Sequence, residues 1–209
     1  LGTVLKFYVL EENFMCGIVG YIGDKQAAPI LLEGLEKLEY RGYDSAGLAI
    51  LNNGKLDVVK AKGRLAVLKE KTAGGKALSG NVGIGHTRWA THGEPSDTNS
   101  HPHLSRSGKF AVVHNGIIEN YLKLRAFLKK KGFEFISETD TEVIPQMISQ
   151  YYNGDFFDAV SKTVKKLEGS YALGRICSDY PDTLIAVRKF SPLIIGVSEN
   201  ENFIASDVT

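Results

Sequence analysis

Met15-Cys16-Gly17-Ile18-Val19-Gly20 opens a short apolar segment that is rich in glycine. Residues 16–22 carry no charged side chain, and an apolar run of this length predicts a buried strand. The strand begins with a cysteine that directly follows a methionine. If translation starts at Met15 and this residue is removed, Cys16 becomes the first residue and carries a free α-amino group.

An N-terminal cysteine carries both a nucleophile, its thiol, and a base, its α-amino group. A free thiol has a pKa of about 8.5 and is mostly protonated at neutral pH. An α-amino group has a pKa of about 7.7–8.0 and can accept a proton there. Cys16 could therefore be activated by its own amine, without a histidine. As the sequence is written, residues 1–15 hold this nitrogen in a peptide bond.

We expect residues 1–15 to be an upstream segment, or one added during cloning, that ends in the initiator methionine Met15. The segment contains Glu11 and Glu12 and lacks the features of a signal peptide. A self-cleaved propeptide is the alternative. Residues 16–209 have the length of one domain.

Composition limits the classes of protein to which this chain can belong. Hydrophobic residues make up 43% of the chain and charged residues 23%, as in globular proteins. The formal net charge of +1 gives no reason to expect nucleic acid or a membrane as a partner. No apolar run is long enough to span a membrane. The two cysteines, Cys16 and Cys177, argue against a disulfide framework and for a reducing compartment, hence the cytoplasm.

Strands are predicted mostly in hairpins. Asn52-Asn53-Gly54 is a strong turn signal. The predicted strands are 16–22, 48–51, 56–59, 82–87, 110–114, 171–177, 183–187, 193–197 and 202–205. The predicted helices are 27–40, 64–72, 119–131, 139–152 and 156–167, the last with Asp155 as its N-cap, and residues 89–108 form a long loop. This order favours antiparallel sheets with helices on their outer faces.

Arg88 and Trp89 follow the strand predicted at 82–87. Arginine can bind a carboxylate through two hydrogen bonds, and a tryptophan at the start of a loop can cover a small ligand. Local signals alone favour an exposed Arg88 and a buried Trp89.

Two further motifs have competing interpretations. Asn115 and the N–H of Gly116 could stabilise an oxyanion, but a lone Asn-Gly pair more often forms an ordinary turn. Asp140 could bind an ammonium group, although local signals favour a helix N-cap at Thr139 or Asp140.

No metal or cofactor is expected. His101-Pro102-His103 has neither a neighbouring cysteine nor the helical spacing of a zinc motif. Dinucleotide and phosphate-loop fingerprints are also missing from the sequence.

Taken together, seven stretches resemble the glutaminase domain of the glutamine–fructose-6-phosphate aminotransferases (isomerising), also called glucosamine-6-phosphate synthases. They occur in the order of that family, from Met15 to the end of the chain. Other class II glutamine amidotransferases, including the purine-pathway phosphoribosyl enzymes, share fewer of them. The stretches are CGIVG at 16–20, LEYRGYDSAG at 38–47, HTRWATHGE at 86–94, HPH at 101–103, HNGIIEN at 114–120, ETDTE at 138–142 and NFIASD at 202–207.

The resemblance implies an α+β fold, a four-layer αββα sandwich of the N-terminal-nucleophile hydrolase type, truncated at its C-terminus. It also implies a reaction in which a cysteinyl thioester forms and L-glutamine gives L-glutamate and ammonia. The implied roles are nucleophile for Cys16, oxyanion donors for Asn115 and Gly116, and substrate binding for Arg88, Trp89, Thr91, His92 and Asp140.

In the whole enzymes of this family, the ammonia passes to fructose 6-phosphate on an isomerase domain. The resemblance implies that this domain is missing here, and that the full-length parent is a homo-oligomer. The alternative is a fragment that binds glutamine or glutamate without catalysis, because the amine of Cys16 is blocked.

Overall fold

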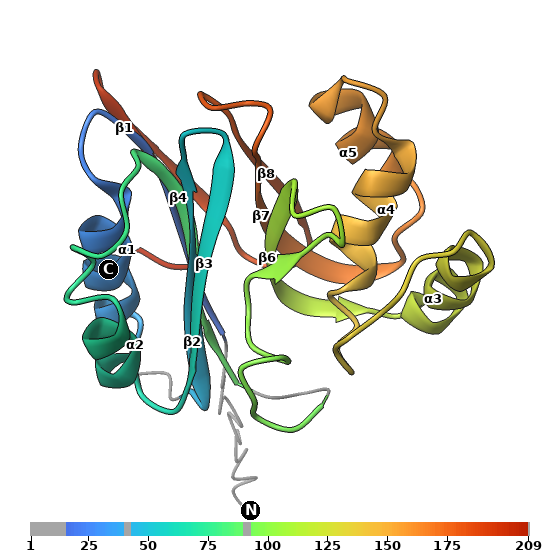
Figure 1. Ribbon diagram of the computed structural model, residues 1–209, viewed down its shortest axis with the longest axis horizontal. Coiled ribbons are helices and arrows are strands. Elements are labelled where there is room, and N and C mark those ends of the chain that lie inside the picture. Colours follow the sequence, from blue (N-terminus) through green and yellow to red (C-terminus); the bar gives the residue numbers. More distant parts are fainter. Residues whose placement is uncertain (1–15, 40–42, 90–92, 209) are drawn as a thin grey trace, which may run out of the picture.

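The computed structural model of the chain describes residues 16–39, 43–89 and 93–208. In this part of the chain, two antiparallel sheets lie face to face and helices cover both outer surfaces (Figure 1). The predicted four-layer αββα sandwich is confirmed.

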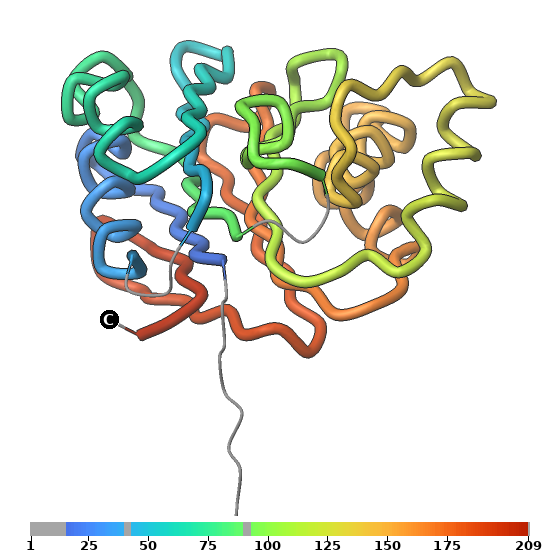
Figure 2. The backbone as a smooth tube through the Cα atoms, turned by 90° about the horizontal axis from the view of Figure 1, so that it is seen from below, coloured from blue at the N-terminus to red at the C-terminus, as the bar shows by residue number. Residues whose placement is uncertain are grey.

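The larger sheet has six strands in the order β3-β2-β4-β1-β10-β9. Strand β1, the predicted apolar segment, lies in its interior between β4 and β10. The tube view shows the last strand, in red, beside the first, in blue (Figure 2). The strands are β1 (Gly17–Gly23), β2 (Ser45–Asn52), β3 (Lys55–Lys62), β4 (Val82–Arg88), β9 (Ile194–Val197) and β10 (Glu201–Ala205).

The smaller sheet has four strands in the order β5-β6-β7-β8. Its short edge strand β5 lies within the segment predicted to be a loop. The strands are β5 (His103–Leu104), β6 (Phe110–Ile118), β7 (Gly169–Cys177) and β8 (Leu184–Lys189).

The helices divide between the two outer layers (Figure 1). Helices α1 and α2 cover the larger sheet, and α3 to α5 cover the smaller one. Asp155 caps α5 as predicted, because its side chain accepts the N–H of Asp158 at 2.9 Å. The helices are α1 (Ala27–Lys37), α2 (Leu65–Lys71), α3 (Tyr121–Lys130), α4 (Val143–Tyr151) and α5 (Phe156–Val164). None of the helices in the described ranges is long and apolar enough to cross a membrane.

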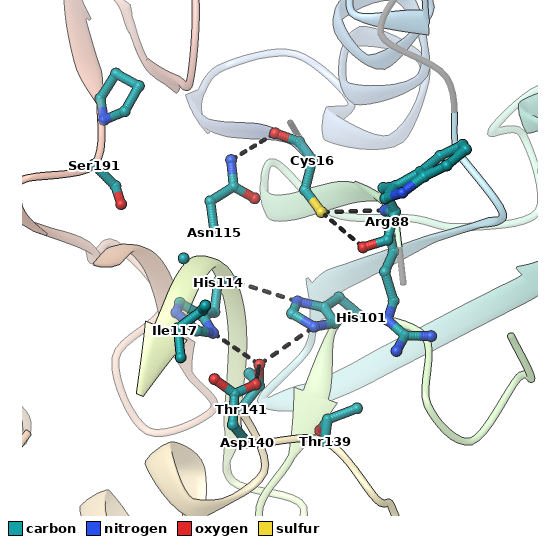
Figure 3. A pocket seen from close by; sticks show the side chains of 13 residues that line it. Cys16, Arg88, His101, His114, Asn115, Ile117, Thr139, Asp140, Thr141 and Ser191 are labelled. Atoms are coloured by element: carbon teal, nitrogen blue, oxygen red, sulfur yellow. Dashed lines mark hydrogen bonds between the residues drawn. The ribbon is translucent and has the colours of Figure 1, made fainter. Parts of the chain in front are cut away.

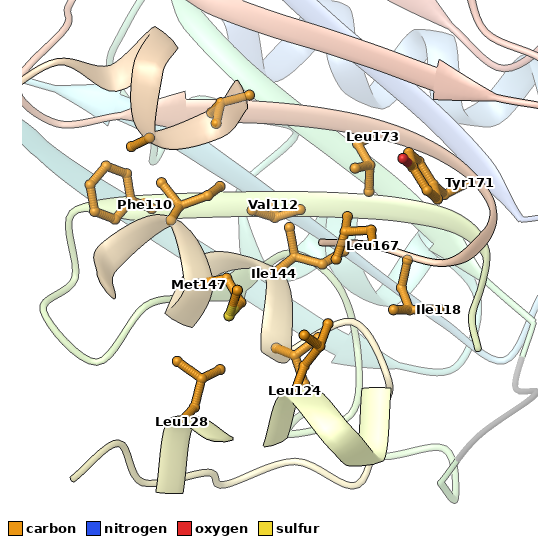
Figure 4. Close-up of a cluster of buried hydrophobic side chains, with 14 of the residues drawn as sticks. Phe110, Val112, Ile118, Leu124, Leu128, Ile144, Met147, Leu167, Tyr171 and Leu173 are labelled. Carbon is orange, nitrogen blue, oxygen red and sulfur yellow. The ribbon is translucent and has the colours of Figure 1, made fainter. Parts of the chain in front are cut away.

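The core has three layers. Figure 4 shows the one between the smaller sheet and its helices, where Phe110 and Val112 of β6 meet Ile144 and Met147 of α4. A second lies under α1 and α2, and a third fills the space between the sheets. Strands alternate their side chains between faces, so residues on the inner faces of both sheets meet in the third layer. The candidate site lies at one end of it.

The hairpin at Asn52-Asn53-Gly54 is confirmed. Asn53 and Gly54 have φ values of 47° and 74°. Two consecutive left-handed residues form the turn that suits the twist of paired strands. The hairpin is longer than predicted, because β2 pairs with β3 from Ser45 to Asn52.

Candidate active site

A pocket of about 240 Å³ lies where β1, β4 and β6 approach one another (Figure 3). Six of the residues proposed from the sequence line it together. Thr91 and His92 lie outside the described residues. The six are Cys16, Arg88, Trp89, Asn115, Gly116 and Asp140.

Cys16 immediately precedes β1 and is half-buried. Its Sγ accepts the backbone N–H of Trp89 at 3.1 Å and lies 3.5 Å from the carbonyl oxygen of the same residue. Burial raises the pKa of the Cys16 thiol, while the Trp89 N–H and the Arg88 charge act in the opposite direction. The thiol is therefore predominantly protonated at neutral pH, and nucleophilic attack requires a base.

The backbone around Cys16 is held from both sheets. Gly17 N–H donates to Thr87 Oγ1 at 3.1 Å, and Asn115 Nδ2 donates to the Cys16 carbonyl oxygen at 2.6 Å. A side chain on Gly17 would meet Thr87 Oγ1 at 2.6 Å. Strand β4 can approach the backbone next to Cys16 because Gly17 has no side chain.

Asn115 and Gly116 lie within β6. The predictions of a strand ending at 114 and of an ordinary turn are both wrong, because β6 continues to Ile118 and pairs with β7 throughout. Gly116 has a φ of 112°, and a Cβ there would lie 2.1 Å from the Ser170 carbonyl oxygen. Only glycine fits this backbone, which is why an Asn-Gly pair can occur inside a strand.

Arg88 and Trp89 reverse the exposure expected from local signals. Arg88 is 4% exposed and Trp89 is 39% exposed. The Arg88 guanidinium donates to the Gly93 carbonyl oxygen at 3.0 Å and lies 3.9 Å from the Asp44 carboxylate. Arg88 is the last residue of β4. The chain leaves the sheet after it, so Trp89 remains at the mouth of the pocket.

Asp140 does not cap a helix. Helix α4 begins at Val143 instead of residue 139, and its N-cap position, Glu142, makes no side-chain cap. Asp140 Oδ2 accepts the backbone N–H of Ile118 at 2.8 Å. Glu142 accepts the N–H groups of Ile136 and Ser137, which fixes the turn before the helix.

Among the described residues, four buried histidines adjoin the pocket, and the sequence did not predict their cluster: His86, His101, His103 and His114. The His86 and His101 rings stack with centroids 4.1 Å apart, and His114 Nδ1 lies 2.8 Å from Thr141 Oγ1. Burial lowers the pKa of His86 to about 3 and those of His101 and His103 well below the ordinary value.

The described residues contain no group of three or more His, Cys, Asp or Glu side chains arranged to hold a metal ion. The only sequence signal for the cluster is weak. His86 and His114 each lie at the end of an apolar strand, a position that an ordinary buried residue would also take.

A four-layer αββα sandwich with a cysteine at the head of a central strand defines a fold of the N-terminal-nucleophile hydrolase type. This chain belongs to the glutamine amidotransferase domain family, whose model matches residues 86–209.

The chain can also be compared with individual relatives. The chain is 65% identical over 194 residues to the glutamine–fructose-6-phosphate aminotransferase (isomerising) of Caldanaerobacter subterraneus subsp. tengcongensis. It is 63% identical to the same enzyme of Clostridium acetobutylicum and 58% identical to that of Aquifex aeolicus. These matches cover 93% of this chain, which spans about a third of the relatives' length, 32–33%.

Solved structures share the fold. The glutamine phosphoribosylpyrophosphate amidotransferase of B. subtilis matches with a TM-score of 0.79 and 28% identity, over 91% of this chain and 42% of that one. A glutamine aminotransferase class-II domain protein from Silicibacter pomeroyi matches with a TM-score of 0.63 over 91% of this chain and 88% of that one. Its 14% identity shows the fold alone.

Proposed function

We propose that this domain hydrolyses L-glutamine to L-glutamate and ammonia, with Cys16 as the nucleophile. One observation carries the proposal: Asn115 Nδ2 donates to the backbone carbonyl oxygen of Cys16 at 2.6 Å, in a pocket that Arg88 and Asp140 also line. Family membership and the names of the relatives support glutamine as the nitrogen donor.

Substrate binding follows from the charges of the pocket. Arg88 takes the α-carboxylate of glutamine through paired hydrogen bonds, and Asp140 takes the α-ammonium group. Trp89 covers the mouth of the pocket. Thr91 and His92 follow it in sequence, and their proposed place in substrate binding rests on the family resemblance.

Cys16 Sγ attacks the side-chain amide carbon, and its proton passes to the α-amine of the same residue when that amine is free. The amide oxygen becomes an oxyanion that accepts hydrogen bonds from Asn115 Nδ2 and the N–H of Gly116. The C–N bond then breaks, and the amine of Cys16 returns a proton so that ammonia leaves. Water hydrolyses the resulting glutamyl thioester and restores the thiol.

The raised pKa of Cys16 makes this amine important. Among the described residues, the hydrogen bonds of the Cys16 thiol are to the backbone of Trp89. The thiol needs an acceptor for its proton, and an α-amino group is matched to neutral pH. In longer proteins of the kind to which the curated relatives belong, the ammonia would pass to fructose 6-phosphate.

The test compares residues 16–209, beginning at Cys16, with the 209-residue chain and with Cys16→Ala in both. We expect glutamate release from glutamine only in the form with a free Cys16 amine. Turnover no greater than in the Cys16→Ala control would refute the activity.

The second candidate is a glutamine- or glutamate-binding fragment without catalysis. The peptide bond at the Cys16 nitrogen favours it for the 209-residue chain, because Arg88 and Asp140 remain in place. Calorimetric titration of that chain with glutamine distinguishes the candidates. Binding without turnover supports this one, and the absence of binding excludes it.

A further inference from the structure

His86 connects the two sheets beside the site. It lies on β4 opposite Ile18 of β1, and its side chain is fully buried. Its Nε2 lies 3.0 Å from the carbonyl oxygen of His114 and 2.9 Å from Asn115 Oδ1. Its Nδ1 is buried and has no hydrogen-bond partner among the described residues.

These contacts select one tautomer of His86. Burial lowers its pKa to about 3, so the ring is neutral and carries one N–H. The His114 carbonyl oxygen can only accept, and a proton on Nε2 satisfies it. A proton on Nδ1 would instead be a buried donor without an acceptor, and would leave the Nε2 lone pair facing the carbonyl oxygen. His86 is therefore an Nε2–H donor.

The tautomer of His86 in turn selects the orientation of the Asn115 amide. The single Nε2–H is shared between the His114 carbonyl oxygen and Asn115, so Asn115 must turn Oδ1 towards it, which turns Nδ2 towards Cys16. A flipped amide would place two donors together at His86 and two acceptors together at Cys16. The Nδ2 group has two hydrogens. One donates to the Cys16 carbonyl oxygen, and the second remains available for an oxyanion.

We propose that His86 is a positioning residue for the hydrolysis of glutamine: the His114 carbonyl fixes its Nε2–H tautomer, and this N–H holds Asn115 with its donor end towards Cys16. The inference rests on the proposed function. His86 acts through Asn115, and its ring has no contact with the Cys16 thiol among the hydrogen bonds of the described residues.

The kinetic test uses His86→Phe, which keeps a ring of similar size but removes the N–H. His86→Gln restores an N–H near the position of Nε2. His103→Gln is the matched control, because His103 belongs to the same buried cluster but pairs with Thr139. Removing one oxyanion donor lowers kcat by about 10²–10³-fold, and a donor that is present but misoriented should cost about 10–100-fold.

We expect His86→Phe to show this loss in kcat with little change in KM, His86→Gln to recover a large part of it, and His103→Gln to keep the wild-type kcat. Iodoacetamide alkylation of Cys16 needs no oxyanion hole and should proceed at the wild-type rate in every variant. An unchanged kcat in His86→Phe would overturn the proposal. So would a parallel loss of alkylation, since that would mean general damage to the site.

A second measurement does not depend on turnover. In the 209-residue chain with ¹⁵N-labelled histidine, the His86 ring signals are those that disappear in His86→Phe. We expect a neutral ring with its proton on Nε2 from pH 5 to 8. A proton on Nδ1, or a titration in this range, would overturn the proposal even if the wild type proves inactive. Inactivity of the wild type with the Nε2–H tautomer present would refute the proposed function and leave the orientation of Asn115 supported.

Discussion

Asp140 Oδ2 accepts the backbone N–H of Ile118 at 2.8 Å, and this bond joins the carboxylate of the site to strand β6. Ile118 lies two residues beyond Gly116 on the same strand. The group proposed to bind the ammonium of glutamine therefore also fixes the strand that carries the proposed oxyanion donors. Substitution can test separately the charge of Asp140 and its role as the hydrogen-bond acceptor of Ile118.

Asp140→Asn should weaken glutamine binding and leave the fold intact. The amide oxygen can still accept from Ile118, but the charge is lost. A hydrogen bond to a charged group contributes about 1.5–3 kcal/mol, so we expect KM or Kd for glutamine to rise roughly 10–100-fold. Asp140→Ala should in addition lower the free energy of unfolding by about 1–2 kcal/mol, because a buried N–H loses its acceptor. Equal glutamine affinity in Asp140→Asn and the wild type would contradict the assignment. Urea titration measures the stability of both variants.

Gly116→Ala should destabilise the protein strongly. A methyl group there meets the Ser170 carbonyl oxygen of the neighbouring strand, and the φ of 112° is unfavourable for any other residue. We expect a loss of at least about 2–3 kcal/mol in the free energy of unfolding. Gly108→Ala is the control. Its φ is 72°, but no atom lies within 4 Å of the added Cβ, so its cost should be about 1–2 kcal/mol. Equal losses in the two variants would show that the contact with Ser170 is unimportant.

Arg175→Met should stabilise the protein. Arg175 is fully buried on β7, opposite Val112 and Ile185, and its three guanidinium nitrogens have no hydrogen-bond partner among the described residues. Burial lowers its pKa to about 9. Replacing a buried charge by an apolar residue of similar volume commonly gains about 1–4 kcal/mol. Thermal and urea unfolding should show a higher Tm and midpoint, and a less stable variant would mean that the guanidinium has a stabilising partner. Arg106→Met is the surface control, since half of the Arg106 side chain is exposed.

Alkylation of Cys16 should depend steeply on pH. Its pKa lies above the ordinary thiol value because of burial, so the thiolate fraction stays small below that pKa and grows about tenfold per pH unit. In the 209-residue chain, the rate with iodoacetamide should therefore keep rising between pH 7 and 8.5. Peptide mass mapping distinguishes Cys16 from Cys177, which is fully buried with its pKa raised to about 11 and should remain unmodified. A plateau below pH 8 would contradict the raised pKa.

Strand and helix order could be predicted because the relevant signals are local. The turn at Asn53-Gly54 and the cap at Asp155 both rest on neighbours within three residues. The end of β6 could not be predicted. Locally, Asn115-Gly116 is typical of a turn, and only the pairing of Gly116 with Tyr171 of β7 shows that the strand continues.

The exposure of Arg88 and Trp89 could not be predicted from the local sequence either. An arginine is usually exposed and a tryptophan usually buried, yet Arg88 is buried and Trp89 is not. Arg88 lies in its buried position because Asp44, just before β2, and Gly93, five residues further along the chain, offer it oxygen atoms.

The sequence by itself determined the residue types: a cysteine that could be N-terminal, an Asn-Gly pair, an arginine and an aspartate, in an order that resembles one family. The tertiary structure decided which atoms face each other. It placed Asn115 Nδ2 against Cys16, Asp140 against Ile118 and His86 Nε2 against Asn115. The physical reason is that these contacts join residues 22 to 99 positions apart. Cys16 and His86 meet Asn115 only when the two sheets close over one apolar layer, and Asp140 meets Ile118 where the turn before α4 lies against the end of β6.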